Sequence, residues 1–362
     1  MSQNTQALRQ AIQEKLQTAI TLELSTLPPY LTAYFSICPN TNIKATEAIR
    51  SVFMEEMLHL CLAANVLVSI GGTVSFSAKT IPQYPCVLGF KGREFNIDLA
   101  RFSRQSVNTF RRIELPDYMP PLDESLHEKE NVSVSGYSIG EFYNSILDDL
   151  HTLHDSCISS KEALFIADAS KQITETYFWR GGGKPIAVVD MDTARAALKE
   201  IIEQGEGTHI SLYDNDNVEF GQTRELAHFF KFNEIYYERE YEENDDPLKP
   251  PSGKKFAVSY GEVYPLKTNC KQSDFADNEE LAQLNHKFNM TYTLMLKQIE
   301  DAYAGNPHVL YNAIMNGMHD LSPIARTMAK IKIDPNDPLS ETGAPSFEWV
   351  QPLEIKETKN GI

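Results

Sequence analysis

The chain contains 362 residues, of which 42% are hydrophobic and 23% are charged. This length corresponds to about two average domains or one large domain, and the composition is globular, which excludes intrinsic disorder for most of the chain. Asp and Glu number 50 and Lys and Arg 33, so the formal net charge is −17. Because such a charge repels phosphate backbones, we expect no nucleic-acid partner and favour a metal cation or a small molecule.

Cysteine usage and the N-terminus bear on the compartment. The five cysteines are scattered and include no Cys-x-x-Cys pair, which argues against a disulfide framework and fits a reducing compartment. The N-terminal segment is polar and has a helical pattern rather than that of a signal peptide, and no stretch approaches roughly 18 uninterrupted apolar residues. We therefore expect a cytoplasmic protein without a membrane span.

Apolar residues recur at three- and four-residue steps along residues 6–36, which predicts a helix. Pro28 and Pro29 late in this run predict a kink or a break. Residues 44–70 are apolar on nearly every side, which is typical of a helix buried by its neighbours. Residues 73–137 contain five prolines and are predicted to be a long excursion with at most one short helix near 98–114.

The rest of the chain alternates helical patterns with polar connections. Further helices are predicted at 138–155, 193–206, 222–240, 279–303 and 307–331. The pattern indicates an all-α protein: a helix bundle over residues 1–332, with irregular insertions at 73–137 and 241–277, and an extended C-terminal tail over 333–362.

Glu56 and His59 form a Glu-x-x-His pair on the predicted buried helix 44–70. Residues three apart on a helix lie one above the other, so the carboxylate and the imidazole could bind the same ion. The neighbouring Glu55 points about 100° away, which suggests a salt bridge or a contact that supports the site. One such tetrapeptide is common by chance.

Two more observations strengthen the pattern. Glu225 and His228 form a second Glu-x-x-His pair, beside inward-facing Phe229 and Phe232, and Glu23 interrupts the apolar stripe of residues 6–36. Bundles that bind two metal ions through carboxylates use one Glu from each of two helices and a Glu-x-x-His from each of the other two. Glu23 would supply one of the single glutamates.

Two residues compete for the remaining glutamate. Glu206 follows Leu198 and Ile202 on an inward stripe, whereas Glu141 follows Ser138 in a capping-box pattern and lies away from the apolar face. The spacing favours Glu206.

Several carboxylates buried together require cations to neutralise them. The predicted metal ligands are therefore Glu23, Glu56, His59, Glu141 or Glu206, Glu225 and His228. Oxygen and imidazole ligands suit two iron ions, or manganese. The second nitrogen of each imidazole is expected to donate to an acceptor outside the ligand set.

Five blocks of the sequence, spread over roughly residues 8–332, resemble the ferritin-like domain of the iminophenyl-pyruvate dimer synthase family, to which the violacein- and rebeccamycin-pathway enzymes are similar. These blocks are FMEEMLHLCLAANVLVSIGG, Tyr84-Pro85, SIGEFY at 138–143, EQGEG at 203–207 and LAHFFKF at 226–232. The resemblance implies a ferritin-like four-helix bundle with accessory helices, used in specialised metabolism. Its SIGEFY block favours Glu141, so Glu141 and Glu206 both remain candidates.

Related larger enzymes of this family couple imines derived from aromatic amino acids and carry further domains. The combined expectation is a dimetal oxidase or oxygenase that acts with dioxygen on a small amino-acid-derived substrate, as a homodimer or with a partner biosynthetic enzyme. The insertions 73–137 and 241–277 would form the substrate pocket or a lid. Metal storage, or a non-catalytic metal-binding or scaffold protein, are the alternatives.

Overall fold

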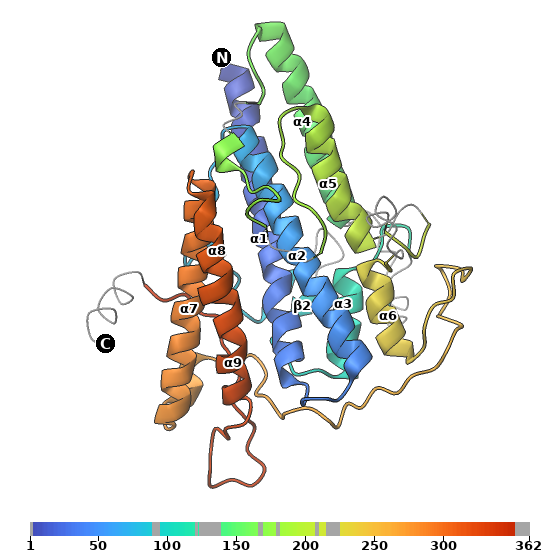
Figure 1. The fold of residues 1–362 in the computed structure, drawn as a ribbon, viewed down its shortest axis with the longest axis vertical. Coiled ribbons are helices and arrows are strands. Elements are labelled where there is room, and N and C mark those ends of the chain that lie inside the picture. Colours follow the sequence, from blue (N-terminus) through green and yellow to red (C-terminus); the bar gives the residue numbers. More distant parts are fainter. Residues whose placement is uncertain are drawn as a thin grey trace, which may run out of the picture.

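Two long helices form the centre of the protein. The structure, a computed structural model, describes residues 3–88, 95–119, 122, 139–165, 169–178, 182–206, 210–214 and 225–351. Helix α1 (Gln3–Ser36) and helix α2 (Ile43–Ser69) are joined by a short connection and pack along each other (Figure 1). Among the described elements, these two helices supply more buried apolar side chains than any other pair.

Helix α1 continues through Pro28 and Pro29, so the break that the sequence predicts does not occur. Pro29 has no N–H group and cannot donate to the carbonyl of Ser25, four residues earlier. The Tyr84 hydroxyl donates to that Ser25 carbonyl instead, at 2.7 Å. A side chain from a distant segment thus replaces a missing helical hydrogen bond.

Helix α2 is as apolar as the sequence suggests. It is long and apolar enough to cross a membrane by length and composition alone, but 83% of its most apolar stretch is buried inside the protein. Because its apolar surface is covered by other helices, α2 is a core helix of the bundle.

Two pairs of shorter helices complete the bundle. Helices α4 (Ile139–Ser160) and α5 (Met191–Glu206) pack on one half of the α1–α2 pair, and α3 (Arg104–Ile113) and α6 (His228–Tyr237) pack on the other half (Figure 1). The C-terminal ends of α3 and α5 and the N-terminal ends of α4 and α6 therefore lie toward the middle of the bundle.

Helix α6 is shorter than the predicted helix 222–240. Residues 225–227 are extended instead, and Leu226 forms a β-bridge with Tyr213. Ala227 N–H donates to the Leu212 carbonyl at 3.0 Å, and Asp214 N–H donates to the Glu225 carbonyl at 3.1 Å. Pairing with residues 212–214 uses the backbone groups that would otherwise begin the helix.

A second layer of helices lies beside α1. Helix α7 (Glu279–Tyr303) is followed by a 3₁₀ turn (Pro307–Val309), α8 (Leu310–Ala313), a π-helical turn (Ile314–Met318) and α9 (His319–Met328). The four segments that follow α7 replace the single predicted helix 307–331. Gly317 packs directly on α7, since a Cβ atom at this position would lie 2.8 Å from the Met295 side chain.

The described residues of the insertion 73–137 and of two later connections contain more regular structure than the sequence predicts. Strands β1 (Cys86–Leu88) and β2 (Phe95–Ile97) pair antiparallel within the predicted excursion 73–137, with Cys86 opposite Ile97. Short 3₁₀ turns occur at Ala169–Lys171 and Gln272–Phe275.

The expected surface tail is partly buried. Phe347 packs on Phe288 and Tyr292 of α7, and Asn285 and Asn289 donate to Ser346 at 2.8 and 2.9 Å. Residues 352–362 lie outside the described residues. The prediction of an all-α helix bundle with additional C-terminal helices is confirmed.

Candidate metal centre

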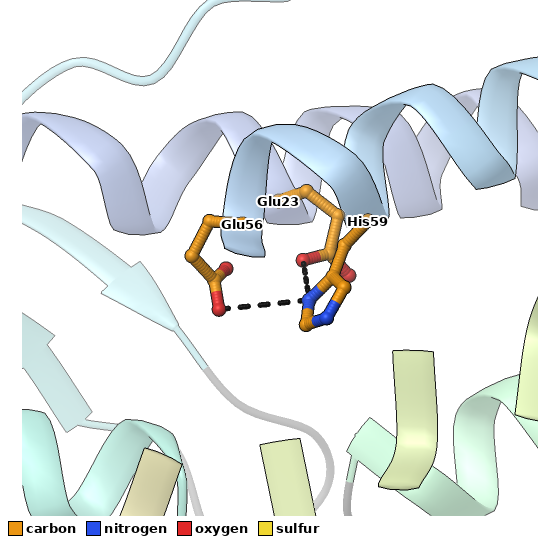
Figure 2. A group of neighbouring side chains, drawn as sticks. All are labelled: Glu23, Glu56 and His59. Atoms are coloured by element: carbon orange, nitrogen blue, oxygen red, sulfur yellow. Dashed lines mark ion pairs between the residues drawn. The ribbon is translucent and has the colours of Figure 1, made fainter. Parts of the chain in front are cut away.

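The first group of candidate ligands lies between α1 and α2. Glu23 is buried in the apolar stripe of α1, and Glu56 and His59 lie one turn apart on α2. Figure 2 shows both carboxylates beside the same imidazole: His59 Nδ1 lies 3.5 Å from Glu23 Oε2 and 3.6 Å from Glu56 Oε1. The buried helix 44–70 of the sequence analysis thus presents its Glu-x-x-His pair to a third residue.

A second group shares one residue with the first. His228 Nδ1 lies 3.0 Å from Glu56 Oε1 and 3.3 Å from Glu114 Oε2. In each group the three potential ligand atoms lie within 4.8 Å of one another, and all residues of both groups are buried. Since Glu56 belongs to both groups, the five residues form one continuous cluster.

The ends of the short helices build this cluster. Glu114 immediately follows α3, and His228 is the first residue of α6. Tyr143 lies near the start of α4, and Gln204 lies in the last turn of α5. The rings of His59 and His228 are stacked, with centroids 5.4 Å apart. The site therefore exists only where the two halves of the bundle meet.

Each residue of the cluster has a hydrogen-bond partner outside the cluster. Tyrosine hydroxyls donate to Glu23 and Glu114, the two carboxylates that belong to one group each, and a threonine hydroxyl donates to the shared Glu56. The second nitrogen of each imidazole faces an acceptor, which is an amide oxygen for His59 and a carboxylate for His228. The pairs are Tyr143–Glu23, Tyr30–Glu114, Thr26–Glu56 at 2.7 Å, His59 Nε2–Gln204 at 2.8 Å and His228 Nε2–Glu55 at 2.7 Å. The expected acceptors for the second imidazole nitrogens are thus present, and these contacts hold all five side chains in place.

Burial and mutual repulsion change the proton affinities. Burial, followed by the charge of Glu114, raises the pKa of Glu56 to about 7. Burial by itself would lower the pKa of His228, but the Glu114 carboxylate and hydrogen bonds to Glu55 and Glu56 raise it well above its usual value. Burial also raises the pKa values of Tyr30 and Tyr143, which keeps both phenols protonated as donors. The cluster therefore favours positive charge at its centre.

Glu55 has a different environment from its neighbour Glu56. Burial alone would raise its pKa, but the ammonium group of Lys231 and a hydrogen bond from His228 lower it to about 2. Lys231 Nζ lies 2.8 Å from Glu55 Oε1. The expected salt bridge of Glu55 is confirmed, and its partner is this buried lysine.

The donor set fits a pair of metal ions. Gln204 Oε1 accepts from His59 Nε2, so the Nδ1 atom of a neutral His59 carries a lone pair. This lone pair would face two carboxylate oxygens, so the arrangement is favourable only when Nδ1 is protonated or when a metal cation lies between these atoms. The same holds for His228, whose Nε2 faces the Glu55 carboxylate. Carboxylate oxygens and imidazole nitrogens are ligands that iron and manganese accept.

Glu225 does not join the cluster. Its side chain is 48% exposed and lies 3.1 Å from Lys231 Nζ. Because residues 225–227 are extended and α6 begins at His228, Glu225 and His228 are not one helical turn apart. The expectation that this Glu-x-x-His pair binds one ion through both residues therefore loses its geometric basis.

The structure also separates the two candidates for the fourth carboxylate. Glu141 is exposed on α4 and belongs to neither group. Tyr143, two residues later on the same helix, contacts the cluster by donating a hydrogen bond to Glu23. Glu206 is the last residue of α5, but its side chain lies outside the described part of the chain, as does Ser138.

Glu114 is the residue that the sequence analysis missed. Its signal was present: Val107, Phe110 and Glu114 are spaced by three and four residues, so Glu114 continues the buried stripe of α3. The stripe was hidden inside a segment that looked irregular because of its prolines. A buried carboxylate at the end of a short amphipathic helix would have been a reasonable candidate.

Comparisons with known proteins agree with this architecture. The sequence profile of the ferritin-like family matches residues 16–237, more than half of the chain. A crystal structure of a ferritin-like protein from Caulobacter vibrioides is similar, with a TM-score of 0.56 at 20% sequence identity over 88% of this chain and 94% of that chain. At this identity the likeness shows the fold alone. No curated protein sequence matches. The matched profile runs from within α1 to the end of α6 and includes all five residues of the cluster, and the chain belongs to the ferritin-like family.

Proposed function

We propose that this protein is an oxidase or oxygenase that uses two bound metal ions and dioxygen. The observation that carries the proposal is the position of Glu56, whose carboxylate belongs to both buried Glu/His groups. Glu56 would contribute to the binding of both cations, and a pair of cations would offset the cost of burying Glu23, Glu56 and Glu114 together.

The ligand types favour iron, with manganese as the second choice. Bound as iron(II), such a pair would supply electrons for the reduction of dioxygen. His59 and Glu23 would hold one ion, His228 and Glu114 the other, and Glu56 would contribute to both. A set of so few protein ligands would leave room for dioxygen or substrate, as is usual for reactive metal sites rather than purely structural ones.

The protein's own groups would hold and shield this site. Tyr143 and Tyr30 donate to the outer carboxylates Glu23 and Glu114, which fixes the carboxylate orientation. Almost complete burial of the cluster keeps bulk water away from the open positions. Fixed orientation and exclusion of water both favour a controlled oxidation over loss of reactive species to solvent.

The substrate that we propose is a small molecule derived from an amino acid, in specialised metabolism. The support is the resemblance of the sequence blocks to the iminophenyl-pyruvate dimer synthases. The insertions 73–137 and 241–277 of the domain 1–332 would form the substrate pocket, with 333–362 as a tail. We further propose a cytoplasmic location and a homodimer or a partner biosynthetic enzyme that delivers the substrate.

The test is to load metal-free protein with Fe²⁺ in the absence of oxygen and to measure bound iron by elemental analysis. We expect two ions per chain. Oxygen is then added, and its consumption and the absorption spectrum are followed, with the Glu56→Gln variant as a control that keeps the side-chain volume. A folded wild-type protein that binds no iron, manganese or other divalent metal would refute the proposal.

The same experiment separates the alternatives. Two bound ions without consumption of oxygen would favour a non-catalytic metal-binding or scaffold protein. Uptake of many ions per chain by a large symmetrical assembly would favour metal storage.

A further inference from the structure

The two halves of the cluster contain the same types of ligand. Glu23, His59 and the shared Glu56 form one group, and Glu114, His228 and the same Glu56 form the other. Both outer carboxylates accept from a buried tyrosine. Any difference in metal affinity between the two positions must therefore come from elsewhere, and the groups that contact the two imidazoles do differ.

A neutral amide contacts His59. Gln204 Nε2 donates to the Gly182 carbonyl at 2.8 Å, with a longer contact of 3.4 Å to Glu200. Because the carbonyl of Gly182 can only accept, the amide NH₂ must face it, and Gln204 Oε1 must face His59. His59 Nε2 then carries the proton, and its Nδ1 lone pair points to the carboxylates. The amide of Gln204 therefore fixes the tautomer of His59 and, being neutral, adds no charge beside it.

A charged carboxylate contacts His228. Glu55 Oε2 lies 2.7 Å from His228 Nε2, and Glu55 Oε1 forms an ion pair with Lys231 at 2.8 Å. Ser51 also donates to Glu55 Oε1, at 2.9 Å. Lys231 and Glu55 are both buried, so the carboxylate is held in one orientation by donors that cannot be replaced easily by water.

We propose that the position formed by Glu56, Glu114 and His228 binds its metal ion more tightly and fills first. An ionised acceptor draws the Nε2 proton of His228 more strongly than an amide oxygen draws that of His59, which makes the His228 imidazole the better donor to a cation. Glu55 and Lys231 are thus positioning residues, and this inference rests on the proposed function.

Lys231 gives the proposal a sharp consequence. Lys231 Nζ lies 2.8 Å from Glu55 Oε1 and 2.9 Å from Oε2, so in the Glu55→Gln variant the ammonium group, which can only donate, faces the new NH₂ group in either orientation of the amide. This contact between two donors disturbs the partner of His228, and where the NH₂ group faces His228 Nε2, the imidazole proton must move to Nδ1, the atom that faces the metal position. The double variant Glu55→Gln with Lys231→Met removes this conflict and gives both imidazoles a neutral amide partner.

The test uses Co²⁺ as the probe, with calorimetric titration and anomalous scattering from crystals prepared at one equivalent. In the wild-type protein we expect two binding steps and an ion beside His228 at one equivalent. Glu55→Gln should weaken the tighter step by about 10- to 100-fold, and the double variant should recover part of this loss and make the two steps more alike.

The outcomes separate this inference from the proposed function. Two bound ions with the first beside His59, or a tighter step that Glu55→Gln leaves unchanged, would overturn the inference and leave the dimetal centre intact. A double variant that binds as weakly as Glu55→Gln would overturn the role given to Lys231. A wild-type protein that takes up no metal ion would overturn both proposals.

Discussion

Two segments of the chain share the pattern Glu-x-x-His but differ in structure. Glu56 and His59 lie in the middle of the 27-residue helix α2, and both side chains are buried in the same cluster. Glu225 and His228 lie on either side of a helix start, and only the histidine enters the cluster. The comparison teaches that a spacing of three residues places two side chains together only where the backbone between them is helical.

The place of the missing carboxylate is taken by a residue from another element. Glu114 lies at the end of α3 and approaches His228 from a sequence distance of 114 residues. Glu225 instead forms a half-exposed ion pair with Lys231. Each imidazole of the cluster therefore lies beside a carboxylate from another element. The carboxylate beside His59 comes from α1, and the one beside His228 follows α3.

The largest effect is expected for Glu56→Gln, which changes the helical motif at the residue shared by both groups. Loss of this carboxylate removes a ligand from both metal positions, and we expect the affinity to fall by more than about 100-fold at each. Elemental analysis after metal loading should give close to no bound metal, with circular dichroism as the control for folding. Retention of two ions would contradict the role of Glu56.

Glu114→Gln should remove one ion and leave the other. The change affects only the group that contains His228, so metal content should fall from two ions to about one per chain. Anomalous scattering would locate the remaining ion beside Glu23 and His59. If the variant still held two ions, Glu114 would not be the carboxylate that replaces Glu225 in the comparison.

Gly182→Ala tests how closely the helical motif is packed. Gly182 has a φ of +74°, and a Cβ atom there would lie 2.6 Å from the backbone Cα of Glu55. Strain and overlap with the backbone of α2 should lower the free energy of unfolding by about 1–3 kcal/mol. Thermal unfolding followed by circular dichroism measures the loss.

Gly261→Ala is the matched control for this change, because nothing lies within 4 Å of a Cβ atom at that position. Its unfolding temperature should stay close to that of the wild-type protein. Equal unfolding temperatures for the two variants would show that the loop at Gly182 is not tightly packed on α2.

The smallest effect is expected for Glu225→Gln, in the motif that is not helical. The ion pair of this half-exposed side chain should be worth less than about 1 kcal/mol, and Lys231 keeps its contact with Glu55. Denaturant unfolding should detect little change, and metal content should stay at two ions per chain. A loss of one ion would restore Glu225 as a ligand and remove the contrast between the two motifs.

Local periodicity was sufficient for most of the architecture. The buried helix α2, the inward position of Glu23 and the pairing of Glu56 with His59 follow from spacing within one helix, and the structure places them as expected. The ferritin-like fold also followed from the order of the sequence blocks and is confirmed by the family match. Helical geometry is a property of neighbouring residues, so a sequence pattern carries it well.

The tertiary structure alone decided how the cluster is completed. Backbone pairing of residues 225–227 with 212–214 makes α6 begin only at His228, after Glu225, and the meeting of the two bundle halves brings Glu114 to His228. In the same way, Tyr84 lets α1 continue past Pro29. The sequence by itself determined which side chains face the interior, because periodicity sets burial within a helix; the ends of the helices, and which ends meet, depend on contacts between distant segments that no local pattern encodes.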